Sequence, residues 1–111
     1  MQVRQIPMAQ LRELIDEQLA HGEALLPVTG NSMWPLLAGG RDMVRLTRLD
    51  RRVQSGDIAL YQKADGSYIL HRVIRLCAPE TCICCGDAQW EGEQVDEAQI
   101  IAYVTAFRRK G

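Results

Sequence analysis

The sequence predicts a mainly β domain with one helix near its N-terminal end. A single apolar pattern of helical period comes first, and six short apolar runs separated by turn residues follow it. Asp65-Gly66 lies between two of these runs and favours the tight turn of a β-hairpin. A helix followed by about six strands is typical of partly closed antiparallel β-sheets.

The length of the chain predicts one domain. A chain of 111 residues is close to the commonest domain size and buries about two-thirds of its unfolded surface. We expect residues 1–111 to form a single unit, in which the helical segment 1–23 packs on a core formed by residues 25–107.

The helix is expected to begin at Pro7, because proline is favoured in the first turn. Gly22 is a typical stop signal, and His21 just before it suits the negative end of the helix dipole. The apolar positions repeat at helical spacing, and they are Met8, Leu11, Leu14, Ile15 and Leu19. The helix therefore has one face to pack on the domain.

The six apolar runs are the predicted strands. They cover residues 25–28, 43–46, 58–61, 68–76, 81–85 and 100–107. A two-residue loop at Asp65-Gly66 would set Ala64 opposite Ser67 and Leu60 opposite His71. Because strand side chains alternate, Ile69, His71 and Val73 share one face.

Net charge and hydropathy limit the classes of partner that we expect for this chain. The net charge is −1, from 13 basic and 14 acidic residues of interspersed sign, which predicts no nucleic-acid partner. No apolar run reaches the roughly 18 to 20 residues that span a bilayer, and no leader pattern is visible. We expect a cytoplasmic protein without a stable membrane span, and docking of the helix on a membrane surface is the alternative to its packing on the domain.

The segment VTGNSMWP places Ser32 between a glycine turn and an apolar step. Such a serine is either an ordinary loop hydroxyl or a nucleophile exposed to substrate. His71, between two β-branched neighbours on a strand face, is either a half-buried structural residue or a base. Asp87 directly follows a predicted strand and is either a turn residue or an orienting carboxylate. The chain order Ser32, His71, Asp87 is admissible for a catalytic triad.

The ordered segments GNSMWPLL, RDMV, GDIALY, YILHRVI and CGD resemble the motifs of the signal-peptidase and SOS-repressor superfamily of serine peptidases. The resemblance covers roughly residues 25–107. It implies that Ser32 is the nucleophile and that His71 is the base, as in the branch of signal peptidases that uses histidine instead of lysine. It also places Asp87 on a Gly-Asp motif, where that branch has an acidic partner.

This assignment is chemically consistent. A neutral imidazole, with an ordinary pKa of about 6.5, can accept a serine proton near neutral pH. We therefore expect the Ser32 hydroxyl within roughly 4 Å of a His71 ring nitrogen, and the Asp87 carboxylate on the far side of the ring. A lysine base is not expected, because the chain has only Lys63 and Lys110, and Lys63 lies near the predicted hairpin tip.

The residues around Ser32 are the candidate oxyanion and substrate-binding groups. The backbone N–H of Ser32 is one oxyanion donor. Gly30 stands where many signal peptidases have a second, hydroxyl donor, and Thr29 or Asn31 are the alternatives for that role. Trp34 and Pro35 are expected to rigidify the loop and to line a substrate groove, and Met33 is a further substrate-binding candidate.

The sequence thus predicts a serine endopeptidase, with a peptide or protein substrate, acyl-enzyme chemistry and no cofactor. Its catalytic group is either a Ser–His dyad or a Ser–His–Asp triad. The alternatives are a catalytically inactive peptide-binding module on the same fold and an accessory part of a larger assembly.

Four cysteines cluster in one segment, and they are Cys77, Cys82, Cys84 and Cys85. We expect free thiols, because a disulfide scaffold would spread its cysteines along the chain. On a strand, Cys84 and Cys85 point to opposite faces, so the four sulfur atoms cannot converge on one zinc ion. No metal site is therefore predicted.

Overall fold

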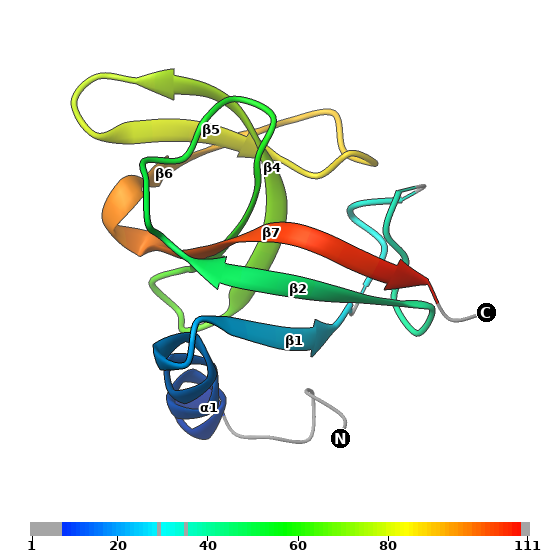
Figure 1. Ribbon diagram of the computed structural model, residues 1–111. Helices are drawn as coiled ribbons and strands as arrows, with labels where there is room; N and C mark the ends of the chain where they lie inside the picture. The colour runs from blue at the N-terminus through cyan, green and yellow to red at the C-terminus, as the bar shows by residue number, and fades with distance from the viewer. Residues whose placement is uncertain (1–7, 29, 35, 110–111) are drawn as a thin grey trace.

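The computed structural model describes residues 8–28, 30–34 and 36–109, whose elements are shown in Figure 1. These elements are α1 (Met8–Ala20), β1 (Glu23–Pro27), β2 (Asp42–Arg48), β3 (Ile58–Gln62), β4 (Tyr68–Cys77), β5 (Thr81–Cys85), β6 (Glu93–Asp96), a 3-10 helix (Glu97–Gln99) and β7 (Ile100–Arg109). The fold is mainly β with one α-helix, as the sequence predicts. Three residues that were assigned roles lie outside the described residues, and they are Pro7, Thr29 and Pro35.

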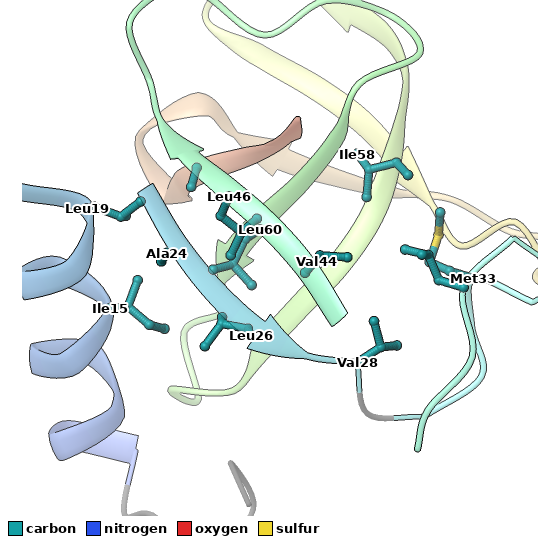
Figure 2. Close-up of a cluster of buried hydrophobic side chains, with 12 residues drawn as sticks. Ile15, Leu19, Ala24, Leu26, Val28, Met33, Val44, Leu46, Ile58 and Leu60 are labelled. Atoms are coloured by element: carbon teal, nitrogen blue, oxygen red, sulfur yellow. The ribbon is translucent and has the colours of Figure 1, made fainter. Parts of the chain in front are cut away.

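Helix α1 packs against β1 and β2 (Figure 1). Ile15 and Leu19 are buried, and Figure 2 shows both directed toward β1. The helix ends before Gly22, whose φ of +111° is a conformation that glycine adopts without steric cost. The predicted stop signal is confirmed.

The described strands form one antiparallel sheet in the order β1-β2-β7-β3-β4-β5-β6. The pairing is interrupted between Arg45 and Leu46, between Leu60 and Tyr61, and between Val73 and Arg75. Such bulges bend strands and increase their twist. The sheet curls so far that residues of β1 and β4, which are not neighbours in the strand order, line one cleft.

The prediction of six strands was short by one, because β6 was missed. Its sequence, EQVD, has a single apolar residue, Val95, and therefore lacks the repeated alternation that marks a strand. Val95 is buried opposite Cys82, and Glu93 lies opposite Cys84. The strand is thus specified by pairing with β5 rather than by its own pattern.

The predicted register of the β3–β4 hairpin is wrong by one residue. Leu60 pairs with Leu70, and His71 pairs with Ala59. Gly66, at φ +90°, donates its N–H to the Lys63 carbonyl at 2.9 Å, and the strands close through a longer loop than the two residues assumed. A shift of one residue exchanges the faces of a strand, so His71 faces the same side as Ala59 and not Leu60.

Two apolar clusters occupy opposite faces of β3. Leu60 belongs to the first cluster, which includes the buried side chains of α1 and is drawn in part in Figure 2. This cluster also contains Met33 from the β1–β2 connection. Ala59 and Tyr61 belong to the second cluster, with Val73 of β4 and Cys84 of β5. His71 therefore lies at the border of the second cluster, on the face that Tyr61 shares.

Candidate active site

Ser32 lies on the connection between β1 and β2, which we call the serine loop (residues 28–41, of which Thr29 and Pro35 are not described). Gly39 donates its N–H to the Gly30 carbonyl at 2.9 Å, and Leu37 donates to the Met33 carbonyl at 2.9 Å. Gly30 has a φ of +75°, which favours glycine at this turn. These bonds fold the loop back on itself and hold Ser32 at its bend.

The buried carboxylate of Asp42 fixes the end of the serine loop. It accepts the Ala38 N–H at 2.9 Å and a guanidinium N–H of Arg41 at 2.8 Å. The Arg41 hydrogen bond holds the pKa of the Asp42 carboxyl below its ordinary value. Asp42 therefore supports the loop that carries Ser32, a role that the segment RDMV alone does not reveal.

The structure brings Ser32 and His71 together. The Ser32 Oγ lies 3.1 Å from Nε2 of His71, although the two residues are 39 positions apart in the chain. This distance is within hydrogen-bond range and within the 4 Å expected from the sequence. A serine and a histidine in this contact have the geometry of a nucleophile and its base.

The other ring nitrogen of His71 contacts a tyrosine and not the expected carboxylate. Nδ1 lies 3.2 Å from the hydroxyl of Tyr61, which is fully buried in β3. The expectation that Asp87 lies on the far side of the imidazole is wrong. The sequence signal for Tyr61 was its position in β3, but the misassigned hairpin register placed it on the opposite face from His71.

Asp87 forms an ion pair with Arg72 instead. The Arg72 guanidinium donates two hydrogen bonds of 2.9 Å to the two carboxylate oxygens. Arg72 neighbours His71 in β4 and therefore points to the other face of the strand. The carboxylate is drawn to this cation, so the arrangement is a Ser–His pair without direct contact to Asp87.

The glycine of the same Gly-Asp motif lies against the backbone of Ser32. Gly86 is buried, and a Cβ at this position would overlap the Ser32 carbonyl oxygen. Ala88 donates its N–H to that carbonyl at 2.8 Å. The turn after β5 therefore holds the backbone of Ser32 in place.

The environment of His71 favours its neutral form. Burial lowers the pKa of His71 below its ordinary 6.5, and the positive charge of Lys63 acts in the same direction. The charges of Glu93 and Asp87 oppose this shift but do not outweigh burial. A neutral imidazole at physiological pH can accept a proton from Ser32.

Two openings meet at the Ser32–His71 pair. The first is a mainly apolar cleft of about 160 Å³ between the end of β1 and the beginning of β4, lined by Leu26, Val28, Tyr68 and Leu70 among others. The second is a shallow groove, lined by Lys63, Gln89, Trp90 and Glu93 among others. Lys63 lies with its Nζ 3.8 Å from Glu93 Oε1 in this groove.

The other residues predicted for the loop have different positions. Met33 is buried in the cluster of Figure 2, and it also forms part of the cleft wall. Trp34 is half exposed beside the Arg41 guanidinium, 5.5 Å from the ring centre, and Asn31 is exposed. Asn31 and Trp34 do not line the cleft, whereas Met33 does.

The cysteines are all free thiols. Cys82 and Cys84 are buried on one face of β5 with their sulfur atoms 3.7 Å apart, and burial raises the pKa of Cys84 to about 12. Over the described residues, no three His, Cys, Asp or Glu side chains are placed to hold a metal ion.

Comparison with protein families, with curated proteins and with solved structures found no match to this chain. Among the described residues, no helix has both the length and the hydropathy needed to cross a membrane.

Proposed function

We propose that this protein is a serine endopeptidase with a Ser32–His71 dyad, on a partly closed domain of the signal-peptidase type. The observation that carries the proposal is the 3.1 Å contact between Ser32 Oγ and His71 Nε2 where a cleft and a groove meet. A hydroxyl, a base on its proton and space on both sides are the elements that acyl transfer to serine requires.

The chemistry follows from these positions. Neutral His71 accepts the Ser32 proton at Nε2 while the serine oxygen attacks a peptide carbonyl carbon. The backbone N–H of Ser32 is the available donor to the resulting oxyanion. The imidazolium then donates its proton to the leaving amine, and an acyl group remains on Ser32. Water, deprotonated by His71, hydrolyses the acyl-enzyme and restores the serine.

Strand pairing supports an extended peptide as substrate. β1 is an outer strand, and the pairing of β4 with β5 begins at Arg72. The part of β4 that precedes Arg72 and lines the cleft thus has a strand edge without a β5 partner. A peptide in the cleft can form backbone hydrogen bonds with such edges. The apolar walls favour small apolar side chains beside the scissile bond.

A fluorophosphonate probe tests the proposal directly, because it reacts with activated serines. We expect the probe to label the wild-type protein at Ser32, and Ser32→Ala to lose all labelling while retaining its unfolding transition. The other two serines provide matched controls, and Ser55→Ala and Ser67→Ala should label at the wild-type rate. A folded wild-type protein that resists labelling would instead support the inactive peptide-binding module.

A further inference from the structure

Gln89, in the turn that follows β5, places a side-chain amide beside Ser32. Its Oε1 accepts the Gly86 N–H at 3.2 Å. This oxygen and the Ser32 Cβ each lie 3.0 Å from the point that a Cβ on Gly86 would occupy, so the two atoms are at most twice that distance apart. Gln89 also lines the groove together with Ser32 and His71. The amide is therefore a near neighbour of the proposed nucleophile.

The contact with Gly86 determines which end of the Gln89 amide can donate. A backbone N–H only donates, so the amide atom that faces it is the oxygen and not the nitrogen. The Gln89 Nε2, with its two N–H bonds, has no hydrogen-bond partner among the described residues. This nitrogen is thus available to donate to a bound ligand.

The backbone of Gln89 is held on both sides of the side chain. Its N–H donates to the Gly86 carbonyl at 2.9 Å, and its carbonyl accepts from the Cys85 thiol at 3.5 Å. The Ala88 N–H donates to the Ser32 carbonyl at 2.8 Å, which joins this turn to the serine loop. A donor held in this way needs little reorganisation when negative charge develops beside it.

The proposed reaction requires a donor at this place. When the Ser32 oxygen bonds to a carbonyl carbon, the π electrons of the C=O bond move to its oxygen, and the Ser32 proton passes to His71. The resulting oxyanion is three covalent bonds from the Ser32 Cβ and needs donors beyond the Ser32 N–H. Gly30 has no side chain, and Asn31 lines neither the cleft nor the groove, so these two residues supply no side-chain donor.

The other donors of the groove are less suited to this role. Lys63 has its Nζ 3.8 Å from a carboxylate oxygen of Glu93. Trp90 is fully exposed, so no packing holds its indole N–H in one position. Among the described residues of the groove, Gln89 is the side-chain N–H donor that remains besides the base His71.

We infer that Gln89 is a catalytic residue whose Nε2 donates a hydrogen bond to the oxyanion formed on Ser32. This role rests on the proposed peptidase function. Gln89 transfers no proton. It stabilises the negative charge while the Ser32 proton passes to His71 and then to the leaving amine, and its oxygen keeps the Gly86 N–H throughout.

The test compares two substitutions of Gln89 in the full chain. Gln89→Glu keeps an oxygen for the Gly86 N–H but has no N–H to donate, whereas Gln89→Met loses both interactions and adds no charge. A loss common to both variants therefore comes from the missing donor. Gln94, which is exposed in β6 and does not line the groove, provides the controls Gln94→Glu and Gln94→Met.

The first measurement is the rate of fluorophosphonate labelling of Ser32 over a series of pH values. The phosphonyl oxygen takes the place of the oxyanion, and on the plateau at high pH His71 is neutral in every variant. We expect both Gln89 variants to label about 100- to 1,000-fold more slowly there, the range for loss of one oxyanion donor. The Gln94 variants should label at the wild-type rate. All four should keep the wild-type urea transition, because both side chains are exposed.

The second measurement is NMR of the side-chain amide groups in the wild-type protein. Phosphonylation of Ser32 should shift the Nε2–H signals of Gln89 and leave those of Gln94 unchanged. This measurement needs no variant, so it decides the question even if a substitution prevents folding.

Two results would overturn the inference. One is Gln89→Glu labelling at the wild-type rate, which, with a slow Gln89→Met, would reduce Gln89 to a support for the Gly86 turn. The other is a Gln89 amide signal that phosphonylation of Ser32 does not shift. In both cases the labelled wild-type protein leaves the peptidase proposal standing. A folded wild-type protein that is not labelled would refute the peptidase proposal itself, and the role of Gln89 with it.

Discussion

Substitution of Gly86 by alanine should displace Ser32, the proposed nucleophile, without removing any side chain of the proposed dyad. A Cβ at residue 86 would lie 3.0 Å from the Ser32 Cβ and would overlap the Ser32 carbonyl oxygen. The second of these contacts is with backbone, which cannot rotate away as a side chain can. Relief of the overlap therefore requires that the backbone of Ser32 move.

The size of the effect follows from these contacts. Carbon atoms normally keep about 3.5 to 4.0 Å between them, so the Cβ contact is too short by about 0.5 Å or more. The Ser32 Oγ is now 3.1 Å from His71 Nε2, and a displacement of this size removes a good hydrogen bond. Because a misplacement of about 1 Å costs about 100-fold in rate, we expect Gly86→Ala to slow fluorophosphonate labelling of Ser32 by about that factor.

The assay is fluorophosphonate labelling of Gly86→Ala, followed by urea denaturation of the same sample. Gly22→Ala is the control, because Gly22 also has positive φ and has no atom within 4 Å of a Cβ. That control should lose about 1 kcal/mol of stability and label normally. If Gly86→Ala labels at the wild-type rate, or if Gly22→Ala slows equally, the argument that Gly86 positions Ser32 is refuted.

Two further predictions concern the neighbours of the dyad. Asp87→Asn should keep kcat/KM within about threefold and cost about 1 kcal/mol or less in urea denaturation, because it breaks only a partly exposed ion pair with Arg72. A loss of several orders of magnitude in kcat/KM would instead show that Asp87 takes part in catalysis. His71 has a lowered pKa, so the unfolded chain binds its proton first as the pH falls below 6.5. The free energy of unfolding should therefore decrease from pH 6.5 down to the folded pKa of His71 and then level off. His71→Gln should lack this decrease in urea denaturations at a series of pH values, and an identical pH dependence in both proteins would contradict the burial of a neutral ring.

Most of the fold could be predicted because its elements have strong local patterns. α1 and six strands follow from apolar periodicity and from the turn residues Gly22 and Asp65-Gly66. β6 could not be predicted in this way, because a strand with one apolar residue is defined by its partner. The register of the β3–β4 hairpin could not be predicted either, since Asp65-Gly66 is compatible with loops of different length.

The candidate site was predictable only where the motif itself carried the chemistry. Ser32 and His71 were chosen correctly as neighbours, because both lie in segments with a recognisable pattern. Tyr61 was missed because a register error of one residue placed it on the wrong face of β3. Glu93 was missed with its strand. The placement of Asp87 beside His71 was wrong because a partly exposed carboxylate pairs with the nearest guanidinium, which the sequence could not place.

The serine loop is joined to the last strand of the fold. Arg41 and Arg109 both donate to the Leu36 carbonyl, at 3.2 and 3.3 Å, and Asp42 holds the Ala38 N–H. Local opening of the loop would break contacts with β7, so the loop belongs to the same cooperative unit as that strand. The conformational entropy of ordering these residues, about 1 to 2 kcal/mol each, is lost when the chain folds and not when a peptide binds. Conditions that loosen β7 should therefore disorder Ser32 as well, which couples the geometry of the proposed dyad to the stability of the whole domain.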